Sequence, residues 1–218
     1  MYFSAPGFIR KMFPMLVWSF PEEESRTVFL TFDDGPTFDL TPWILDKLDE
    51  YDAKATFFCL GKNVEQHPNE YDMIVSRGHA VGNHSYSHIK GWGNSVSSYV
   101  QDFDLASEFI DSNLIRPPYG RITPSQARVL NERYKLIMWD ILSRDYSRTI
   151  SRRGCVRNVV KHLQPGSIIV FHDSMKARRN LKYALPRILE TLRNEAYQCI
   201  KIYINQSFKI SSASKYRV

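Results

Sequence analysis

The chain has 218 residues, of which 43% are hydrophobic and 24% are charged, and it carries a formal net charge of +6. These values predict a soluble globular protein with one buried core, and they exclude a second full domain. The basic charge is compatible with an anionic partner. No aromatic ladder, zinc-finger spacing or helix–turn–helix pattern accompanies it, so nucleic acid is not the expected partner.

Residues 1–25 are predicted to be an N-terminal extension that packs on the domain. Residues 13–20 are apolar, but Pro14 interrupts them and no small-residue cleavage site precedes the acidic residues 22–24. This pattern predicts neither a cleavable signal peptide nor a transmembrane segment, which needs about 20 apolar residues. Contact with a membrane surface is the alternative. Three scattered cysteines without a CxxC pair favour a reducing, cytoplasmic location. A cell-envelope location stays open.

Strand-like and helical segments alternate along the remaining chain. Seven segments rich in β-branched and aromatic residues are predicted strands: Thr27–Phe32, Ala55–Leu60, Ala80–Val81, Leu114–Arg116, Lys135–Trp139, Ile168–Phe171 and Gln198–Ile204. Segments with apolar residues near helical spacing are predicted helices: one beginning at Thr41, then Asn69–Arg77, Ser95–Asp111, Thr123–Asn131, Ser151–Leu163 and Leu181–Asn194. Thr41 is the predicted N-cap of the first helix, with Pro42 in its first turn.

This alternation predicts an α/β fold with a mostly parallel sheet and crossover helices, and one closed or nearly closed barrel buries it most simply. The domain is expected over residues 26–205, followed by a polar tail at 206–218. Barrels of this type carry their chemistry on the loops after the strands. Polar clusters follow the predicted strands at those places: Asp33–Asp34, His84–His88, Arg116–Gly120, Asp140–Asp145 and His172–Asp173.

Two adjacent carboxylates, Asp33 and Asp34, follow the first predicted strand. Neighbouring acids repel each other unless a cation or another partner separates their roles, so the pair is interpreted as one metal ligand beside one free base. A surface turn is the alternative for such a pair taken alone.

Two histidines, His84 and His88, are four residues apart, so on one turn of helix they would face the same way and share a cation. With Asp34 they would make a His–His–Asp set, which leaves a position for water as catalytic zinc sites do. His67, His79 and His162 fit no such set and are predicted to be surface or packing residues.

Five ordered motifs resemble those of the polysaccharide deacetylases that share the NodB homology domain, carbohydrate esterase family 4. They are TFDDGP at 31–36, HSYSH at 84–88, RPPYG at 116–120, the loop 139–146 and VFHD at 170–173. Together they span nearly the whole chain. The resemblance implies a distorted (β/α)7 barrel and a hydrolase that removes N-acetyl groups from an amino-sugar glycan.

The resemblance also implies a divalent metal ion held by Asp34, His84 and His88. Zinc is the expected ion, with Co²⁺, Ni²⁺ and Mn²⁺ as alternatives. Such an ion lowers the pKa of water and polarises a carbonyl group, both of which amide hydrolysis requires. Asp33, which is adjacent to the ligand but not part of the set, is implied to be the general base.

The third, fourth and fifth motifs supply the other catalytic residues that the resemblance implies. Arg116 is expected to orient Asp33 through charge-assisted hydrogen bonds. His172 is expected to be the general acid, which needs a carboxylate partner that favours its charged form. The resemblance gives Asp145 as that partner, and Asp140 is the second choice.

Five residues are implied to contact the substrate. The backbone N–H of Tyr119 is expected to bind the developing oxyanion, and Pro117 and Gly120 belong to the same turn, where glycine lets the chain approach the substrate. Tyr146 is expected in the wall of the substrate groove. Val170 is expected to line a small pocket for the acetyl methyl group.

The chain departs from the family pattern mainly in the fourth motif. Leu142 and Arg144 are unusual there, Tyr146 replaces tryptophan, and Val170 stands where leucine is more common. These departures concern the substrate rather than the reaction. Basic residues also gather after the fifth and sixth predicted strands: Arg144, Arg148, Arg152, Arg153, Arg157, Lys161, Lys176, Arg178, Arg179 and Lys182. They form either a solvated helix face or a surface that favours an anionic, phosphate-bearing or lipid-linked amino sugar.

Two alternative functions stay open. One is deacetylation or deformylation of a small or lipid-linked intracellular N-acyl amino sugar, which the missing signal peptide favours. The other is an inactive glycan-binding protein, although every implied catalytic and ligand residue is present. The sequence indicates no oligomeric state.

Overall fold

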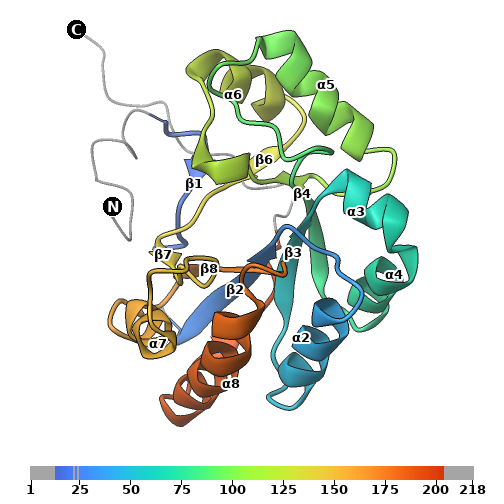
Figure 1. Ribbon diagram of the computed structural model, residues 1–218. Coiled ribbons are helices and arrows are strands. Elements are labelled where there is room, and N and C mark those ends of the chain that lie inside the picture. The colour runs from blue at the N-terminus through green and yellow to red at the C-terminus, as the bar shows by residue number, and fades with distance from the viewer. Residues whose placement is uncertain (1–12, 22, 24, 204–218) are drawn as a thin grey trace, which may run out of the picture.

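The computed structural model describes residues 13–21, 23 and 25–203. The predicted tail at 206–218 and the first twelve residues lie outside this part of the chain. The described residues form one curled sheet with helices packed around its outer face (Figure 1). The nine strands are β1 (Leu16–Val17), β2 (Thr27–Asp33), β3 (Ala55–Cys59), β4 (Ala80–Asn83), β5 (Leu114–Ile115), β6 (Lys135–Ile137), β7 (Ile141–Leu142), β8 (Ile168–His172) and β9 (Gln198–Cys199).

The sheet is parallel at every pairing of these strands. Its order is β1-β6-β5-β4-β3-β2-β8-β7, with β9 beside β2. In the described residues the sheet therefore curls into an open, distorted barrel, which confirms the predicted fold class. The helices are α2 (Leu40–Asp49), α3 (Gly61–Gln66), α4 (Pro68–Ser76), α5 (Val96–Ala106), α6 (Pro124–Asn131), α7 (Arg152–Val160) and α8 (Arg178–Asn194).

The alternation of side chains along β2 and β8 separates the core from the interior of the curl. Three apolar side chains of β2 face the helices and are completely buried: Val28, Leu30 and Phe32. Alternate positions point the other way, so Phe29 lies at the bottom of the interior and Asp33 at its top. On β8 the same alternation places Ile168 at the bottom and His172 at the top. Strand register then sets Asp33 beside His172.

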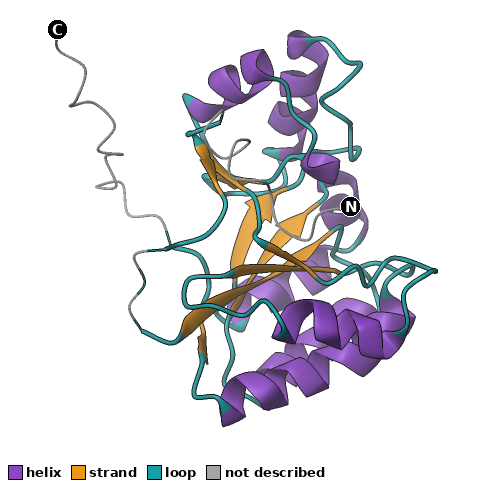
Figure 2. Ribbon diagram, turned by 90° about the vertical axis from the view of Figure 1, so that its left-hand side faces the viewer, coloured by secondary structure: helices purple, strands orange, loops and turns teal. Residues whose placement is uncertain are grey.

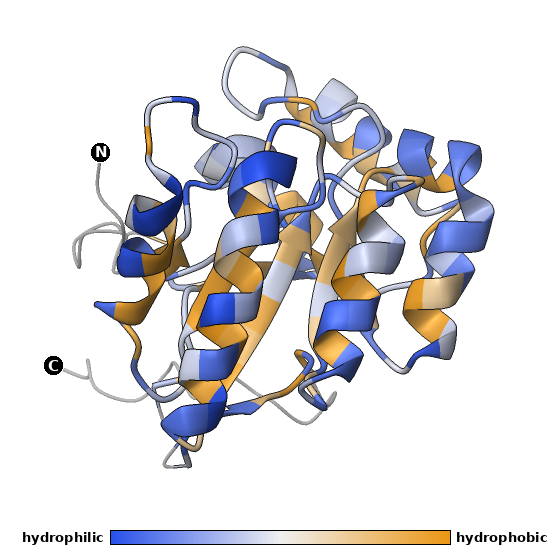
Figure 3. Cartoon of the chain, turned by 60° about the horizontal axis from the view of Figure 1, so that its bottom comes forward, coloured by the Kyte–Doolittle hydropathy of each residue, from blue (hydrophilic) through white to orange (hydrophobic). Residues whose placement is uncertain are grey.

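The helices cover the outer face of the sheet with amphipathic surfaces. Their polar residues lie away from the strands (Figure 3), and Figure 2 shows the strands between the helices. On α8 six apolar side chains are buried against the sheet: Leu181, Ala184, Leu185, Ile188, Leu189 and Leu192. None of the described helices has the length and apolar character needed to cross a bilayer.

The first helix begins differently from the prediction. α2 starts at Leu40 after Asp39, which makes no side-chain cap, so the N-cap assigned to Thr41 was wrong. The Thr41 hydroxyl accepts a hydrogen bond from the backbone N of Thr37 at 2.7 Å and donates one to the carboxylate of Asp173. A tertiary contact therefore takes the hydroxyl that sequence reasoning had assigned to the cap.

The described part of the N-terminal extension contributes an edge strand. Leu16 and Val17 pair with Leu136 and Ile137 of β6, and the side chain of Leu16 is buried. A single antiparallel bridge joins Ser19 to the start of β8. Residues 16 and 17 thus extend the sheet beside β6, and Ser19 contacts the residue before β8.

Candidate active site

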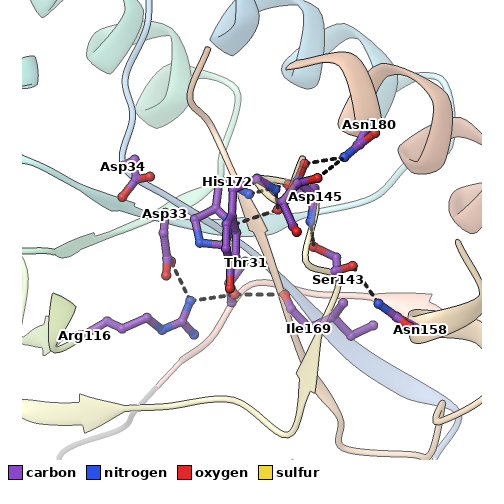
Figure 4. Close-up of polar contacts among 12 residues, drawn as sticks. Thr31, Asp33, Asp34, Arg116, Ser143, Asp145, Asn158, Ile169, His172 and Asn180 are labelled. Atoms are coloured by element: carbon purple, nitrogen blue, oxygen red, sulfur yellow. Dashed lines mark hydrogen bonds and ion pairs between the residues drawn. The ribbon is translucent and has the colours of Figure 1, made fainter. Parts of the chain in front are cut away.

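A cavity of about 700 Å³ opens at the carboxyl edge of the sheet. Its walls come from the loops that follow β2, β3, β4, β5, β7 and β8. Asp33, Asp34, His84, His88 and His172 all line it. Figure 4 shows part of this arrangement: Asp33 and Asp34 lie on one side of the His172 ring, and Asp145 lies on the other.

Asp34, His84 and His88 bring three ligand atoms together. The Nε2 atoms of His88 and His84 lie 3.3 and 3.8 Å from Oδ1 of Asp34. Atoms bound to one tetrahedral zinc ion at about 2.0–2.1 Å are roughly 3.4 Å apart, so these separations fit a shared ion. Oδ1 of Asp34 is buried and accepts no hydrogen bond within the described chain. Such an orphaned carboxylate oxygen needs a cation, and these residues therefore fit a metal ion.

The two imidazoles are prepared to act as ligands. Nδ1 of His84 donates to the backbone O of Arg116 at 2.8 Å, which leaves Nε2 unprotonated and directed at Asp34. Burial lowers the pKa of His84. Burial, reinforced by His84, also lowers the pKa of His88 to about 4 despite the opposing charge of Asp34. Both rings are therefore neutral near pH 7, which ligation requires.

The two histidines lie on a loop and not on a helix, so that part of the prediction was wrong. Ser85 and His88 both adopt positive φ, 66° and 64°. The Ser85 hydroxyl accepts hydrogen bonds from the backbone N of His88 at 3.0 Å and of Ile89 at 3.3 Å. This tight turn brings the rings to the same side at a spacing that resembles that of a helix.

Arg116 forms the floor beneath Asp33. Its guanidinium is completely buried and lies 4.0 Å from the ring centroid of Phe58. Nη1 donates to Oδ1 of Asp33 at 2.6 Å and to the hydroxyl of Thr31 at 2.7 Å. Nε and Nη2 donate to backbone oxygens of residues 137 and 138. Because a buried charge is tolerated only when paired and hydrogen-bonded, this network fixes the Asp33 carboxylate.

His172 is held by Asp145, as the resemblance implies. Its Nδ1 donates to Oδ1 of Asp145 at 2.8 Å, and its backbone N donates to Oδ2 at 2.8 Å. Burial lowers the pKa of His172, but the charge and hydrogen bond of Asp145 outweigh burial and, with Asp34 and Asp33, raise it to about 9. The ring is therefore protonated at neutral pH. Nδ1 is occupied, so Nε2 is the nitrogen left for the substrate.

Asp140, the second choice for this partner, lies elsewhere. Its carboxylate accepts hydrogen bonds from the Ser167 hydroxyl at 2.9 Å and from the backbone N of Ile168 at 2.7 Å. It thus binds the beginning of β8, whereas His172 lies at the end of that strand. The strand's length separates the two.

The other three histidines make their contacts outside the Asp34–His84–His88 set. His67 lies between α3 and α4, with Nδ1 3.8 Å from Glu70. His79 is buried and accepts a hydrogen bond from the backbone N of Ala55. Nδ1 of His162 lies 3.0 Å from the backbone O of Asn158 on α7.

The predicted substrate residues divide into two groups. Tyr119, Tyr146 and Val170 line the cavity, and the Tyr146 ring lies edge-on to His172 with centroids 4.7 Å apart. Pro117 and Gly120 are not part of this lining. Gly120 has φ +63°, and a Cβ there would lie 2.8 Å from Trp139, so glycine serves close packing of the turn.

Tyr119 has an unusual backbone. Its φ is 60°, and its half-exposed ring lies 4.4 Å from the His88 ring. Within the described chain its backbone N–H donates no hydrogen bond. The N–H is therefore available to a substrate oxygen, which suits the role that the resemblance implies.

Sequence reasoning gave no role to Asp173. This completely buried carboxylate accepts hydrogen bonds from the hydroxyls of Thr37, at 2.8 Å, and Thr41, while its backbone N donates to the backbone O of Asp33 at 2.7 Å. Burial raises its pKa to about 7 against the opposing threonine hydrogen bonds. Asp173 thus ties β8 to the loop that carries Asp34. Its place directly after His172 was the only signal in the sequence.

Removing the Asp173 carboxylate should loosen this loop. In Asp173→Ala the buried hydroxyl of Thr41 and the partly buried hydroxyl of Thr37 lose their acceptor, so the free energy of unfolding should fall by about 1–3 kcal/mol. Urea unfolding measures the change. Asp39→Ala is the control because it removes a half-exposed ion pair with Arg178 and should cost at most about 1 kcal/mol. Equal stability of the two variants would contradict a structural role for Asp173.

Comparison with known protein families gives a match to the polysaccharide deacetylase family. The match covers residues 21–134, which include the first three motifs. Two peptidoglycan-N-acetylglucosamine deacetylases of Bacillus cereus are 36% identical over 154 residues and 30% identical over 195 residues. The first match covers 67% of this chain and 56% of the relative, so the chain spans about half of that protein. The second covers 86% of this chain and 91% of the relative.

A solved structure extends the likeness to three dimensions. It is a peptidoglycan N-acetylglucosamine deacetylase in complex with a naphthalenyl N-hydroxybenzamide. The two chains superpose with a TM-score of 0.82 at 30% sequence identity, over 91% of this chain and 95% of the other.

Proposed function

Because the chain belongs to the polysaccharide deacetylase family, we propose that it is a metal-dependent hydrolase that removes N-acetyl groups from an amino-sugar glycan. One observation carries the proposal: Asp33 and His172, on neighbouring strands, flank a cavity that also contains the Asp34–His84–His88 set. Several relatives are named as peptidoglycan deacetylases, so peptidoglycan is the first substrate to test.

The metal ion in this proposal is zinc, held by Asp34, His84 and His88. A His–His–Asp set that leaves one position open is typical of catalytic zinc sites. When bound, the ion supplies a lowered pKa for water and polarisation of the amide carbonyl. Elemental analysis of the purified protein distinguishes zinc from cobalt, nickel and manganese.

Asp33 takes the proton of the attacking water. Its Oδ1 is occupied by Arg116, so Oδ2 is the oxygen that accepts the proton. The buried guanidinium keeps the carboxylate in one orientation, and the backbone N–H of Tyr119 is placed to stabilise the negative charge that develops on the carbonyl oxygen.

His172 completes the reaction by donating a proton from Nε2 to the amide nitrogen as the carbon–nitrogen bond breaks. The products are acetate and a free amine on the sugar. Asp145 keeps the imidazole charged before the transfer, because its charge and hydrogen bond outweigh burial. The two carboxylates thus have different tasks: Asp33 accepts a proton from water, and Asp145 keeps His172 protonated.

Replacing Asp145 tests this division through pH. A general acid works only when protonated, so wild-type activity should fall as pH rises through the His172 pKa of about 9. In Asp145→Asn the charge and hydrogen bond that oppose burial are lost, so the pKa of His172 should fall from about 9 toward the ordinary 6.5. At pH 8 the variant should retain about a tenth of wild-type activity or less. Acetate release from pH 5 to 10 measures both profiles, with Asp140→Asn as the control. An alkaline limb that stays in place in Asp145→Asn would contradict the pairing.

The function itself is tested by incubating the protein with peptidoglycan fragments and with N-acetylglucosamine oligomers. The proposal predicts equimolar release of acetate and free amine from at least one polymer. Product from a soluble N-acyl sugar but from no polymer would favour the small-substrate alternative. Glycan binding without any acetate release would favour the inactive binding protein.

A further inference from the structure

A second cavity, of about 400 Å³, lies between the beginnings of α7 and α8. Its lining includes Arg152, Arg153 and Arg179, together with Asn180 and Tyr183. It shares no lining residue with the active-site cavity. The loop between β7 and α7 reaches both, because Tyr146 lines the first cavity and Ile150 lines the second.

The arginines around this cavity are placed against the usual electrostatics of a helix. The N-terminal end of a helix carries partial positive charge, so acidic residues are favoured there and basic ones are not. α7 begins with Arg152 and Arg153, α8 begins with Arg178 and Arg179, and neither helix has an acidic residue in its first turn. The cavity is therefore strongly positive.

Only one of these four arginines has a counter-ion among the described residues. Arg178 lies 2.8 Å from a carboxylate oxygen of Asp39, outside the cavity lining. No described carboxylate lies within ion-pair distance of Arg152, Arg153 or Arg179. Three cations therefore converge on one cavity without compensation from the described chain, and a bound anion would supply it.

Three side chains of the cavity wall, Arg152, Asn180 and Tyr183, are held in place by contacts within the chain. The guanidinium of Arg152 lies over the Tyr183 ring, 5.3 Å from its centroid, and Arg187 lies 3.8 Å from the same ring. Asn180 is buried and donates to the backbone oxygens of Asp145 and Ser147, at 2.8 and 3.1 Å. All three arginines of the cavity are exposed to solvent, and their planar guanidinium groups match the geometry of phosphate oxygens.

We propose that this second cavity is a binding site for a phosphate group, held by Arg152, Arg153 and Arg179. A phosphate dianion neutralises two of the three charges and accepts several hydrogen bonds at once. The assignment does not depend on the deacetylase proposal, because it concerns a separate cavity and is tested by binding.

The test is calorimetric titration of the full-length, metal-loaded protein with inorganic phosphate at constant ionic strength. The cavity variant is Arg152→Gln/Arg179→Gln. The control, Arg157→Gln/Lys161→Gln, removes the same charge from exposed positions at and beyond the last turn of α7. Wild type and control should bind phosphate saturably with affinities within about twofold of each other. The cavity variant should bind phosphate at least about tenfold more weakly than the wild type. Thermal unfolding of all three proteins checks that each is folded.

Three results would overturn the assignment. The first is no saturable binding by the wild type up to about 20 mM phosphate. The second is full retention of binding by the folded cavity variant, which would place phosphate elsewhere, including at a metal held by the Asp34 set. The third is an equal loss in the control, which would show that net charge alone attracts the anion.

A further comparison identifies the source of the phosphate group. Sedimentation with phosphatidylglycerol vesicles, against phosphatidylcholine vesicles, tests a lipid headgroup. Titration with N-acetylglucosamine 6-phosphate, against the unphosphorylated sugar, tests a sugar phosphate. Wild-type binding that the cavity variant loses assigns the source in either arm. If neither arm shows it while inorganic phosphate binds, free phosphate is the ligand.

Discussion

Asp33→Asn should keep the metal ion and lose nearly all turnover. An asparagine side chain has the same shape and can still accept the hydrogen bond from Arg116, but its amide cannot take the proton of the attacking water. Loss of a general base lowers kcat by about 10²- to 10⁴-fold. Acetate release measures the rate, and elemental analysis of the same sample measures the metal.

The same substitution leaves the buried Arg116 without a counter-ion. Removing one partner of a buried ion pair costs about 3–5 kcal/mol, so the unfolding temperature should also fall. Activity is therefore measured well below that temperature. Asp46→Asn, at an exposed carboxylate 2.7 Å from Arg77, is the control and should turn over at the wild-type rate. More than about a tenth of wild-type turnover in folded Asp33→Asn would remove Asp33 from the role of base.

His84→Ala should lose both metal and turnover. His84 supplies one of only three ligands in the proposed set, and its ring is fixed by the Arg116 carbonyl. Losing a ligand weakens metal binding far more than losing a residue that merely orients one, for which the loss is about 10- to 100-fold. Elemental analysis after dialysis measures retention.

Because His84 is buried, alanine there leaves a void and an unpaired carbonyl. His88→Ala provides a second variant at a more exposed ring, 22% accessible, where folding is less affected. His67→Ala, at a half-exposed ring near Glu70, is the control and should keep metal and activity. Full metal retention by both ligand variants would contradict the assignment of this set.

The fold was largely predictable because its main elements are locally encoded. Each of the seven predicted strands has a counterpart among the described residues, although the last is shorter than predicted and only partly buried, and residue 204 at its predicted end lies outside the described residues. β1 and β7 were missed because each has only two residues and lies in a segment that was interpreted otherwise, β1 in the N-terminal extension and β7 in the loop after the fifth predicted strand. α3 was missed for a related reason: with six residues it shows too little of a helical period to recognise.

The candidate site was predictable to the extent that its residues occur at strand ends. Asp33 and His172 come together because β2 and β8 pair in parallel, and this register places them side by side. Asp145 and Arg116 also lie where the resemblance places them. The helix expected at His84 and His88 was wrong because spacing alone does not distinguish a helical turn from a loop held by Ser85.

The supporting contacts could not be predicted. Asp173 acts through Thr37 and Thr41, which are 136 and 132 residues away in the sequence. Asn180 reaches back 35 residues to the carbonyl of Asp145. Such hydrogen bonds depend on tertiary structure, and no local pattern of residues indicates them.

The most direct test of the account is acetate release by the wild-type protein after its metal has been removed with a chelator and then restored with zinc. If Asp34, His84 and His88 hold one catalytic ion, the stripped protein is inactive and activity rises linearly to a plateau at one equivalent. Undiminished release by the metal-free protein would contradict the central claim.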